Sequence, residues 1–172
     1  MIVLHRFNLF KRLESSVYSF EETLRRLLER IERTEQLLMK GTGNVTEEDG
    51  DFNEEDSDDL YLEGKYEIDV HHLRIDDYLE DLSSDKCIIA EIHNSAKKVL
   101  EENRDQKLQD LKRVLKKKAI ETPYNAGNRK VLLFTAFADT ADYLYKNLSE
   151  EMLKLGVYTA CVTGKGVVTN NR

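Results

Sequence analysis

The sequence contains a single proline, two cysteines and no long apolar run. One proline and a charged share of 34% favour long solvated helices over a compact β-sandwich or β-barrel. No stretch approaches the roughly 20 apolar residues of a membrane-spanning helix. Polar and charged residues interrupt the first apolar residues, which argues against a signal peptide. These absences predict a cytoplasmic protein with no membrane association.

The two cysteines and the charge pattern narrow the class of protein further. Cys87 and Cys161 stand far apart, without the spacing of a metal site, and predict two reduced thiols. The net charge of -7 conceals an asymmetry, because nine of the thirteen residues from Glu47 to Asp59 are acidic. From Arg104 to Lys118, seven residues are basic. The acidic average argues against nucleic acid as a partner, whereas the basic block keeps it open.

The first two segments of the chain differ in apolar content. Residues 1–40 predict one long amphipathic helix, whose apolar stripe recurs at steps of three and four: Phe7, Phe10, Leu13, Val17, Phe20, Leu24, Leu27 and Ile31. Residues 41–64 are acidic and nearly free of apolar side chains. Such a segment buries too little surface to offset its ordering entropy, so it predicts a flexible insertion.

Residues 65–122 predict a mainly helical region. A short extended piece is expected near residues 66–70, followed by helices at about 76–82, 85–103 and 105–120. The second of these helices should bury Ile88, Ile92, Ala96 and Val99. Thr122-Pro123 is expected to end the last helix.

Residues 123–172 carry a strand, helix and strand pattern. The apolar run Lys130–Phe137 passes into a helix that should end near Gly156, and a second apolar run extends from Val157 to Val162. The expected fold is therefore α+β and mostly helical, with long amphipathic helices followed by an incomplete parallel βαβ unit. Two parallel strands leave both sheet edges open, so we expect the chain to be a piece of a larger protein, able to self-associate through the incomplete sheet.

Most candidate motifs for calcium, metal or nucleotide binding lack a residue that the motif requires at a fixed spacing. Asp49, Asp51 and Asn53 match the start of a calcium-binding loop, but Glu54 replaces its glycine and Leu60 its last carboxylate. His71 and His72 are adjacent and lack a third metal ligand. Thr163-Gly164-Lys165-Gly166 lacks the earlier glycine of an ATP-binding P-loop. It predicts either a plain turn or a loop in which glycine backbone and Lys165 approach a phosphate.

Several motifs, in their order along the chain, resemble superfamily-two helicases, closest to bacterial Swi/Snf-type ATPases. The strand Lys130–Phe137 is similar to motif IV of the family, and the run Asp139–Leu144 and Val162-Thr163-Gly164 follow it in the same order. Asp105-Gln106-Lys107-Leu108 looks like the helix that enters the C-terminal RecA-like lobe. Phe10–Ser16 is similar to the segment between the two lobes. The resemblance implies that residues 123–172 begin this lobe.

The resemblance also implies a function. The parent protein would couple ATP hydrolysis, with ATP and Mg²⁺, to movement along duplex DNA. The residues implied to face the nucleic-acid backbone are Thr135, Ala136, Phe137, Thr163, Gly164 and Lys165. Ala136 replaces a glutamine that is frequent in the family. No catalytic, cofactor-binding or metal residue is assigned in this chain, because the phosphate cradle, magnesium ligands and arginine that phosphoryl transfer needs are missing. Alone it should be inactive and bind DNA weakly.

Two other functions remain open. The chain would be a helical protein-interaction module if the long first helix and the acidic tract recruit a partner. A small flavodoxin-like or receiver-like α/β domain fits less well, because the sequence has no room for five strands.

Overall fold

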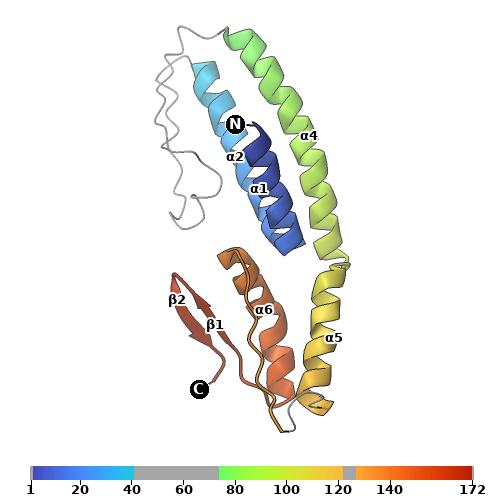
Figure 1. Cartoon of the computed structure of the whole chain (residues 1–172). Helices are drawn as coiled ribbons and strands as arrows, with labels where there is room; N and C mark the ends of the chain where they lie inside the picture. The colour runs from blue at the N-terminus through green and yellow to red at the C-terminus, as the bar shows by residue number, and fades with distance from the viewer. Residues whose placement is uncertain (1, 41–73, 122–126, 172) are drawn as a thin grey trace. The chain divides into compact units, whose positions relative to one another are not determined.

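The computed structural model describes residues 2–40, 74–121 and 127–171, which form two compact units (Figure 1). One unit contains Met1–Phe10 and Phe20–Lys98, and the other contains Lys11–Ser19 and Val99–Arg172. The described residues are mostly helical with one small antiparallel sheet, which is compatible with the predicted α+β class. The acidic tract, the residues tested for calcium, the extended piece near 66–70, His71, His72 and Thr122-Pro123 lie outside the described residues.

The first 40 residues form two helices, α1 (Ile2–Ser15) and α2 (Val17–Lys40), so the prediction of one continuous helix was wrong. Ser16 separates them. Its Oγ accepts a hydrogen bond from the Ser19 backbone N–H at 3.0 Å, which is the geometry of a helix N-cap. A serine at this position therefore ends one helix and starts the next.

The first unit pairs α2 with α4 (Ile75–Glu101) in opposite directions. Early on α2, Glu21 contacts His93 at 2.8 Å, and later on α2, Glu35 contacts Lys86 at 2.8 Å. The partner number on α4 falls as the number on α2 rises, so the two helices are antiparallel. Buried apolar residues on these helices are Leu24, Leu38 and Ala96.

Helix α4 corrects two expectations. It is continuous where two helices were predicted, since Ser83 and Ser84 continue the helix. The predicted burial of Ile88 and Ile92 was wrong, because these side chains are 55% and 43% exposed. The helix ends with Asn103 at a φ of 55° and with the Arg104 N–H donating to the Val99 carbonyl at 2.8 Å. This is the closure of a Schellman motif.

In the second unit, α5 (Gln106–Glu121) packs on α6 (Ala138–Lys154), as Figure 1 shows. Their shared core contains Leu108, Leu115, Leu148 and Met152. Helix α6 closes at Gly156, where φ is +71° and the Val157 N–H donates to the Met152 carbonyl at 2.9 Å. The predicted bounds of both helices agree with the structure to within a few residues.

The sheet differs from the predicted parallel arrangement. Strands β1 (Ala160–Thr163) and β2 (Gly166–Thr169) form an antiparallel hairpin, in which Cys161 lies opposite Val168. The run Val131–Phe134, predicted as the first parallel strand, has no strand assignment. It makes no hydrogen bond to any part of the chain that the structure describes.

The path of this unpaired run follows from its two ends. Arg129 donates through Nη2 to the Leu155 carbonyl, at the C-terminal end of α6, and Phe137 is the N-cap of the same helix. A helix of 17 residues is about 25 Å long at a rise of about 1.5 Å per residue. The eight steps from Arg129 to Phe137 reach that length only if the chain is nearly extended, at about 3.3 Å per residue. Residues 129–137 therefore run beside α6 in the opposite direction (Figure 1).

Candidate functional site

The predicted nucleic-acid residues before α6 differ in exposure. Thr135 and Ala136 are exposed, and the Thr135 hydroxyl donates to the Phe137 carbonyl at 2.7 Å. Phe137 is buried and has the extended backbone of an N-cap, with φ -124° and ψ 136°. Its ring lies under the Arg12 guanidinium, 4.6 Å from Cζ to the ring centre. The ring is therefore engaged inside the protein, while Thr135 and Ala136 face outward.

The other predicted residues form the turn of the β hairpin. Thr163 is the last residue of β1, and Gly164 and Lys165 make the two-residue connection to β2. The Lys165 backbone N–H donates to the Thr163 hydroxyl at 3.3 Å, and the Lys165 side chain is exposed. In the described part of the chain, the hydrogen bonds of Thr135 and of Thr163 stay within their own segments.

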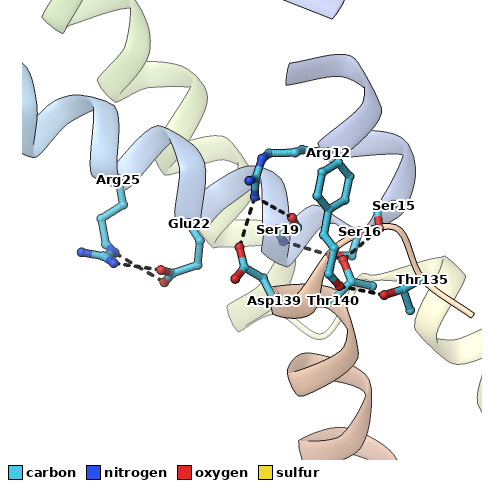
Figure 2. A network of polar contacts seen from close by, with 10 residues as sticks. Arg12, Ser15, Ser16, Ser19, Glu22, Arg25, Thr135, Asp139 and Thr140 are labelled. Carbon is cyan, nitrogen blue, oxygen red and sulfur yellow. Dashed lines mark hydrogen bonds and ion pairs between the residues drawn. The ribbon is translucent and has the colours of Figure 1, made fainter. Parts of the chain in front are cut away.

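A buried ion pair lies next to the first group, and the sequence had not identified it. Arg12 Nη1 contacts Asp139 Oδ2 at 3.1 Å, and their side chains are 2% and 9% exposed. The same nitrogen donates to Ser19 Oγ at 3.3 Å (Figure 2). Asp139 belongs to the first turn of α6, where a negative charge is also favoured by the helix dipole. A cation above an aromatic ring adds further attraction when it is desolvated.

Hydroxyl groups extend this contact along the α1–α2 junction. The Thr140 hydroxyl lies 2.8 Å from Ser15 Oγ and 3.1 Å from Ser16 Oγ. We refer to the whole group as the Arg12 cluster, which comprises Arg12, Ser15, Ser16, Ser19, Phe137, Asp139 and Thr140. Figure 2 shows that its labelled members come from the α1–α2 junction and from the start of α6, where Phe137 is the N-cap. The cluster therefore fixes the point where residues 129–137 enter the helix.

A second polar contact lies one turn further along α6. The Tyr143 hydroxyl donates to Asp105 Oδ2 at 2.9 Å, and the Tyr143 ring stacks on Tyr18 with ring centres 4.8 Å apart. Asp105 is buried and caps α5, because its Oδ1 accepts the Leu108 N–H at 3.0 Å. Burial, and then the hydrogen bond to Asp105, raise the pKa of Tyr143. Tyr143 is therefore a neutral hydrogen-bond donor at ordinary pH.

The basic block of α5 is divided between internal contacts and solvent. Lys116 and Lys112 contact Glu151 of α6 at 2.5 Å and 3.8 Å. The hydrogen bond from Lys116 is the main cause that lowers the pKa of Glu151. Lys107 donates to the Glu14 and Ser15 carbonyls. Arg113 and Lys117 are exposed, and within the described residues their ion pairs are with Asp110 and Glu121 of the same helix.

The two cysteines differ in their burial. Cys161 is buried, which raises the pKa of its thiol, and Cys87 is exposed; neither forms a disulfide. Residues 2–40, 74–121 and 127–171 contain no group of three His, Cys, Asp or Glu side chains placed to hold a metal ion. None of the helices in these ranges is both long and apolar enough to cross a membrane.

The contacts of the Arg12 cluster give no local signal in the sequence. Arg12 and Asp139 are 127 positions apart, and either could be read as an ordinary surface charge. The nearest signal is a run of small polar residues, Ser15-Ser16 and Ser19, inside an amphipathic helix pattern. Such residues favour caps and turns over helix interiors. Neither known protein families, nor curated proteins, nor solved structures gave a match to this chain.

Proposed function

We propose that this chain supplies the inter-lobe helices and the first strands of the C-terminal RecA-like lobe of a Swi/Snf-type, ATP-dependent DNA translocase. The observation that carries the proposal is the extended, unpaired apolar run Val131–Phe134 beside α6. Leu132 and Phe134 are 83% and 91% exposed, and the backbone of the run has no hydrogen-bond partner in the described residues. An apolar extended segment with a free backbone is suited to pair with further strands.

The path of the chain around α6 supports a parallel βαβ unit. Cys161 of β1 lies 3.8 Å, Sγ to Oδ1, from Asp142 near the start of α6. Asn170, which bonds to Thr159 just before β1, also donates to the Ser149 carbonyl further along α6. Strand β1 therefore runs opposite to α6, and residues 129–137 do the same. Two extended segments that both oppose one helix run in the same direction, as strands of a βαβ unit do.

This geometry places the ends of both segments on one side of the unit. Thr135 and Ala136 end the first segment, and Thr163 to Lys165 end the second. Ligands of parallel α/β sheets bind beyond the carboxyl ends of the strands. In the proposal, exposed backbone at Thr135 and Ala136 and the Lys165 charge contact phosphate groups of duplex DNA. Phe137 would take part through its backbone, since its ring packs under Arg12.

The proposal assigns ATP hydrolysis to other parts of the translocase. The 172 residues contain no Gly-Lys-Ser/Thr sequence, so they lack a P-loop for ATP and Mg²⁺. Phosphoryl transfer requires the phosphate cradle, the magnesium ligands and an arginine together. The role of this chain is then to position DNA-facing strands and to hold them, through the Arg12 cluster, against the segment Lys11–Ser19 of the same unit.

The test starts from the reading frame that contains this sequence. We expect a Walker A motif upstream and an arginine-rich motif downstream, and we expect the full product to hydrolyse ATP faster when duplex DNA is added. The 172-residue chain is the control and should show no ATPase activity. A reading frame without a nucleotide-binding motif would refute the proposal and favour the helical interaction module.

DNA binding by the chain itself gives an independent measurement. A few lysine and arginine contacts should give weak binding, with a Kd of about 10⁻⁴ M or higher, that weakens further as salt is raised. Lys165→Glu should weaken DNA binding. Lys154→Glu should have a smaller effect, because Lys154 lies at the C-terminal end of α6, away from the residues proposed to face DNA. Tight binding that does not respond to salt would contradict the assignment.

A further inference from the structure

Helix α4 exposes a stripe that is acidic at one end and apolar at the other. Asp81, Asp85, Ile88 and Ile92 follow one another at steps of four, three and four, so they lie on one face of the helix. All four side chains are exposed. Neither Asp81 nor Asp85 has an ion-pair or hydrogen-bond partner in the part of the chain that the structure describes. This face therefore combines uncovered isoleucines with unpaired negative charge.

Helix α5 exposes a stripe of opposite charge with the same spacing. Arg113, Lys117 and Ile120 follow at steps of four and three, and all are exposed. Arg113 contacts Asp110, and Lys117 contacts Glu121, both on the same helix. Such exposed pairs within one helix are weak, so both cations can take another carboxylate as partner.

The two stripes match in order as well as in charge. Adding the same offset of 32 positions to residues 81, 85 and 88 gives residues 113, 117 and 120. A parallel alignment of the two helices places Asp81 opposite Arg113, Asp85 opposite Lys117 and Ile88 opposite Ile120. Opposite charges and apolar side chains thus coincide at three consecutive positions of the stripe.

The acidic segment Glu47–Asp59 is a poor partner for the α4 stripe because of its charge. Nine of the thirteen residues from Glu47 to Asp59 are acidic, and an acidic segment is repelled by unpaired carboxylates. A basic helix would complement this stripe, and α5 has the matching charge and spacing.

We propose that the α4 stripe of one copy of this chain binds the α5 stripe of a second copy, with the two helices parallel. The two surfaces are different patches of the chain, so the contact is heterologous. In a pair of copies, one copy keeps a free α5 stripe and the other keeps a free α4 stripe. Further copies can bind to these free stripes, so the assembly grows into a ring or an open chain. This inference stands independently of the translocase proposal.

Sedimentation velocity of the intact chain at several concentrations and two salt levels tests the contact. At about 0.01 M salt, where charges act over about 30 Å, the average mass should rise with concentration to at least about twice that of one chain. At about 1 M salt, where the range falls to about 3 Å, the chain should return to the monomer. A monomer at low salt overturns the proposal, and so does assembly that is unaffected by salt, which would indicate pairing through Val131–Phe134.

A charge exchange between two variants identifies the surfaces. Asp81→Lys/Asp85→Lys makes both stripes positive, and Arg113→Glu/Lys117→Glu makes both negative, so each variant alone should remain monomeric. An equimolar mixture should associate again, because each variant then meets a stripe of opposite charge. Glu80→Lys/Glu91→Lys, with the same charge change elsewhere on α4, is the matched control and should still self-associate. A mixture of variants with wild-type helical circular dichroism that stays monomeric overturns the proposal.

Discussion

Two arginines of this protein, Arg12 and Arg25, make ion pairs in opposite settings (Figure 2). Arg12 is almost completely buried and reaches Asp139, 127 positions away. Arg25 lies on α2 with its side chain 43% exposed, and its partners Glu22 and Glu29 are three and four positions away. The bond lengths are similar, at 3.1 Å for Arg12 and 2.8 Å and 2.6 Å for Arg25. The distances alone therefore do not show which arginine matters more for stability.

Exposure to solvent decides how much the ion pairs of each arginine affect the stability of the protein. Water screens the Arg25 pairs, and the long side chains lose rotamer entropy when they are held in one geometry. Around Arg12 little water remains, so removing the cation leaves the Asp139 carboxylate in a poorly solvated site. The comparison indicates that removing the Arg12 cation would cost the second unit more stability than removing the Arg25 cation would cost α2.

The largest expected effect is that of Arg12→Ala. Breaking a buried pair by removing one partner costs about 3–5 kcal/mol, because a buried charge is left uncompensated. Arg25→Ala is the matched control and should change the free energy of unfolding by no more than about 1 kcal/mol. Urea denaturation followed by circular dichroism measures both changes.

The double variant Arg12→Ala/Asp139→Ala sharpens this comparison. It should recover part of the stability lost in Arg12→Ala, since it no longer contains the unpaired carboxylate. Equal losses for Arg12→Ala and Arg25→Ala would show that the burial of Arg12 has no energetic consequence.

The same contrast explains which features the sequence could predict. The Arg25 pairs, the bounds of α5 and the end of α6 at Gly156 depend on residues a few positions apart. Local rules of helix spacing and glycine closure cover such cases. The break at Ser16 also has a local component, since serine favours helix caps, but the same residue type inside α4 at Ser83 did not end a helix. At Ser16 the hydroxyl also meets Thr140, a contact that only the fold supplies.

The candidate site was predictable only in part. The sequence located the Thr163–Gly166 turn and the entry into α6, where the structure has the hairpin connection and the N-cap. It could not foresee that the Phe137 ring would pack under Arg12, because that contact joins residues more than a hundred positions apart. Nor could periodicity alone decide the buried face of α4, where apolar residues occur on two sides and His93 and Lys86 face α2.

A smaller effect is expected at the second polar contact of α6. Tyr143→Phe keeps the ring that stacks on Tyr18 but removes the donor to Asp105. We expect a loss of about 1–3 kcal/mol, because the buried carboxylate loses one hydrogen-bond partner. Tyr145→Phe changes the same functional group on the same helix and serves as the control. Unfolding free energies that agree for the two variants would assign no stability to the Tyr143–Asp105 bond.

The smallest effect should come from Glu151, a partly exposed carboxylate that resembles the Arg25 partners in its setting but contacts another helix. Its pKa is lowered in the folded protein, mainly by the hydrogen bond from Lys116. A group with a depressed pKa contributes stability above its unfolded pKa, about 4.5, and this contribution is lost as pH falls through the folded value. Solvent limits the contribution to below about 1 kcal/mol.

Glu151→Gln should therefore lower the stability slightly at pH 7 and make no difference in strong acid. Comparing the two proteins in urea titrations from neutral to acidic pH cancels the other carboxylates, which titrate in both. Glu150→Gln, one position earlier and exposed, is the control and should follow the wild-type curve. A difference between Glu151→Gln and wild type that grew as pH fell would mean that Lys116 and Lys112 do not stabilise the ionised carboxylate. The bridge between α5 and α6 would then depend on the apolar core alone.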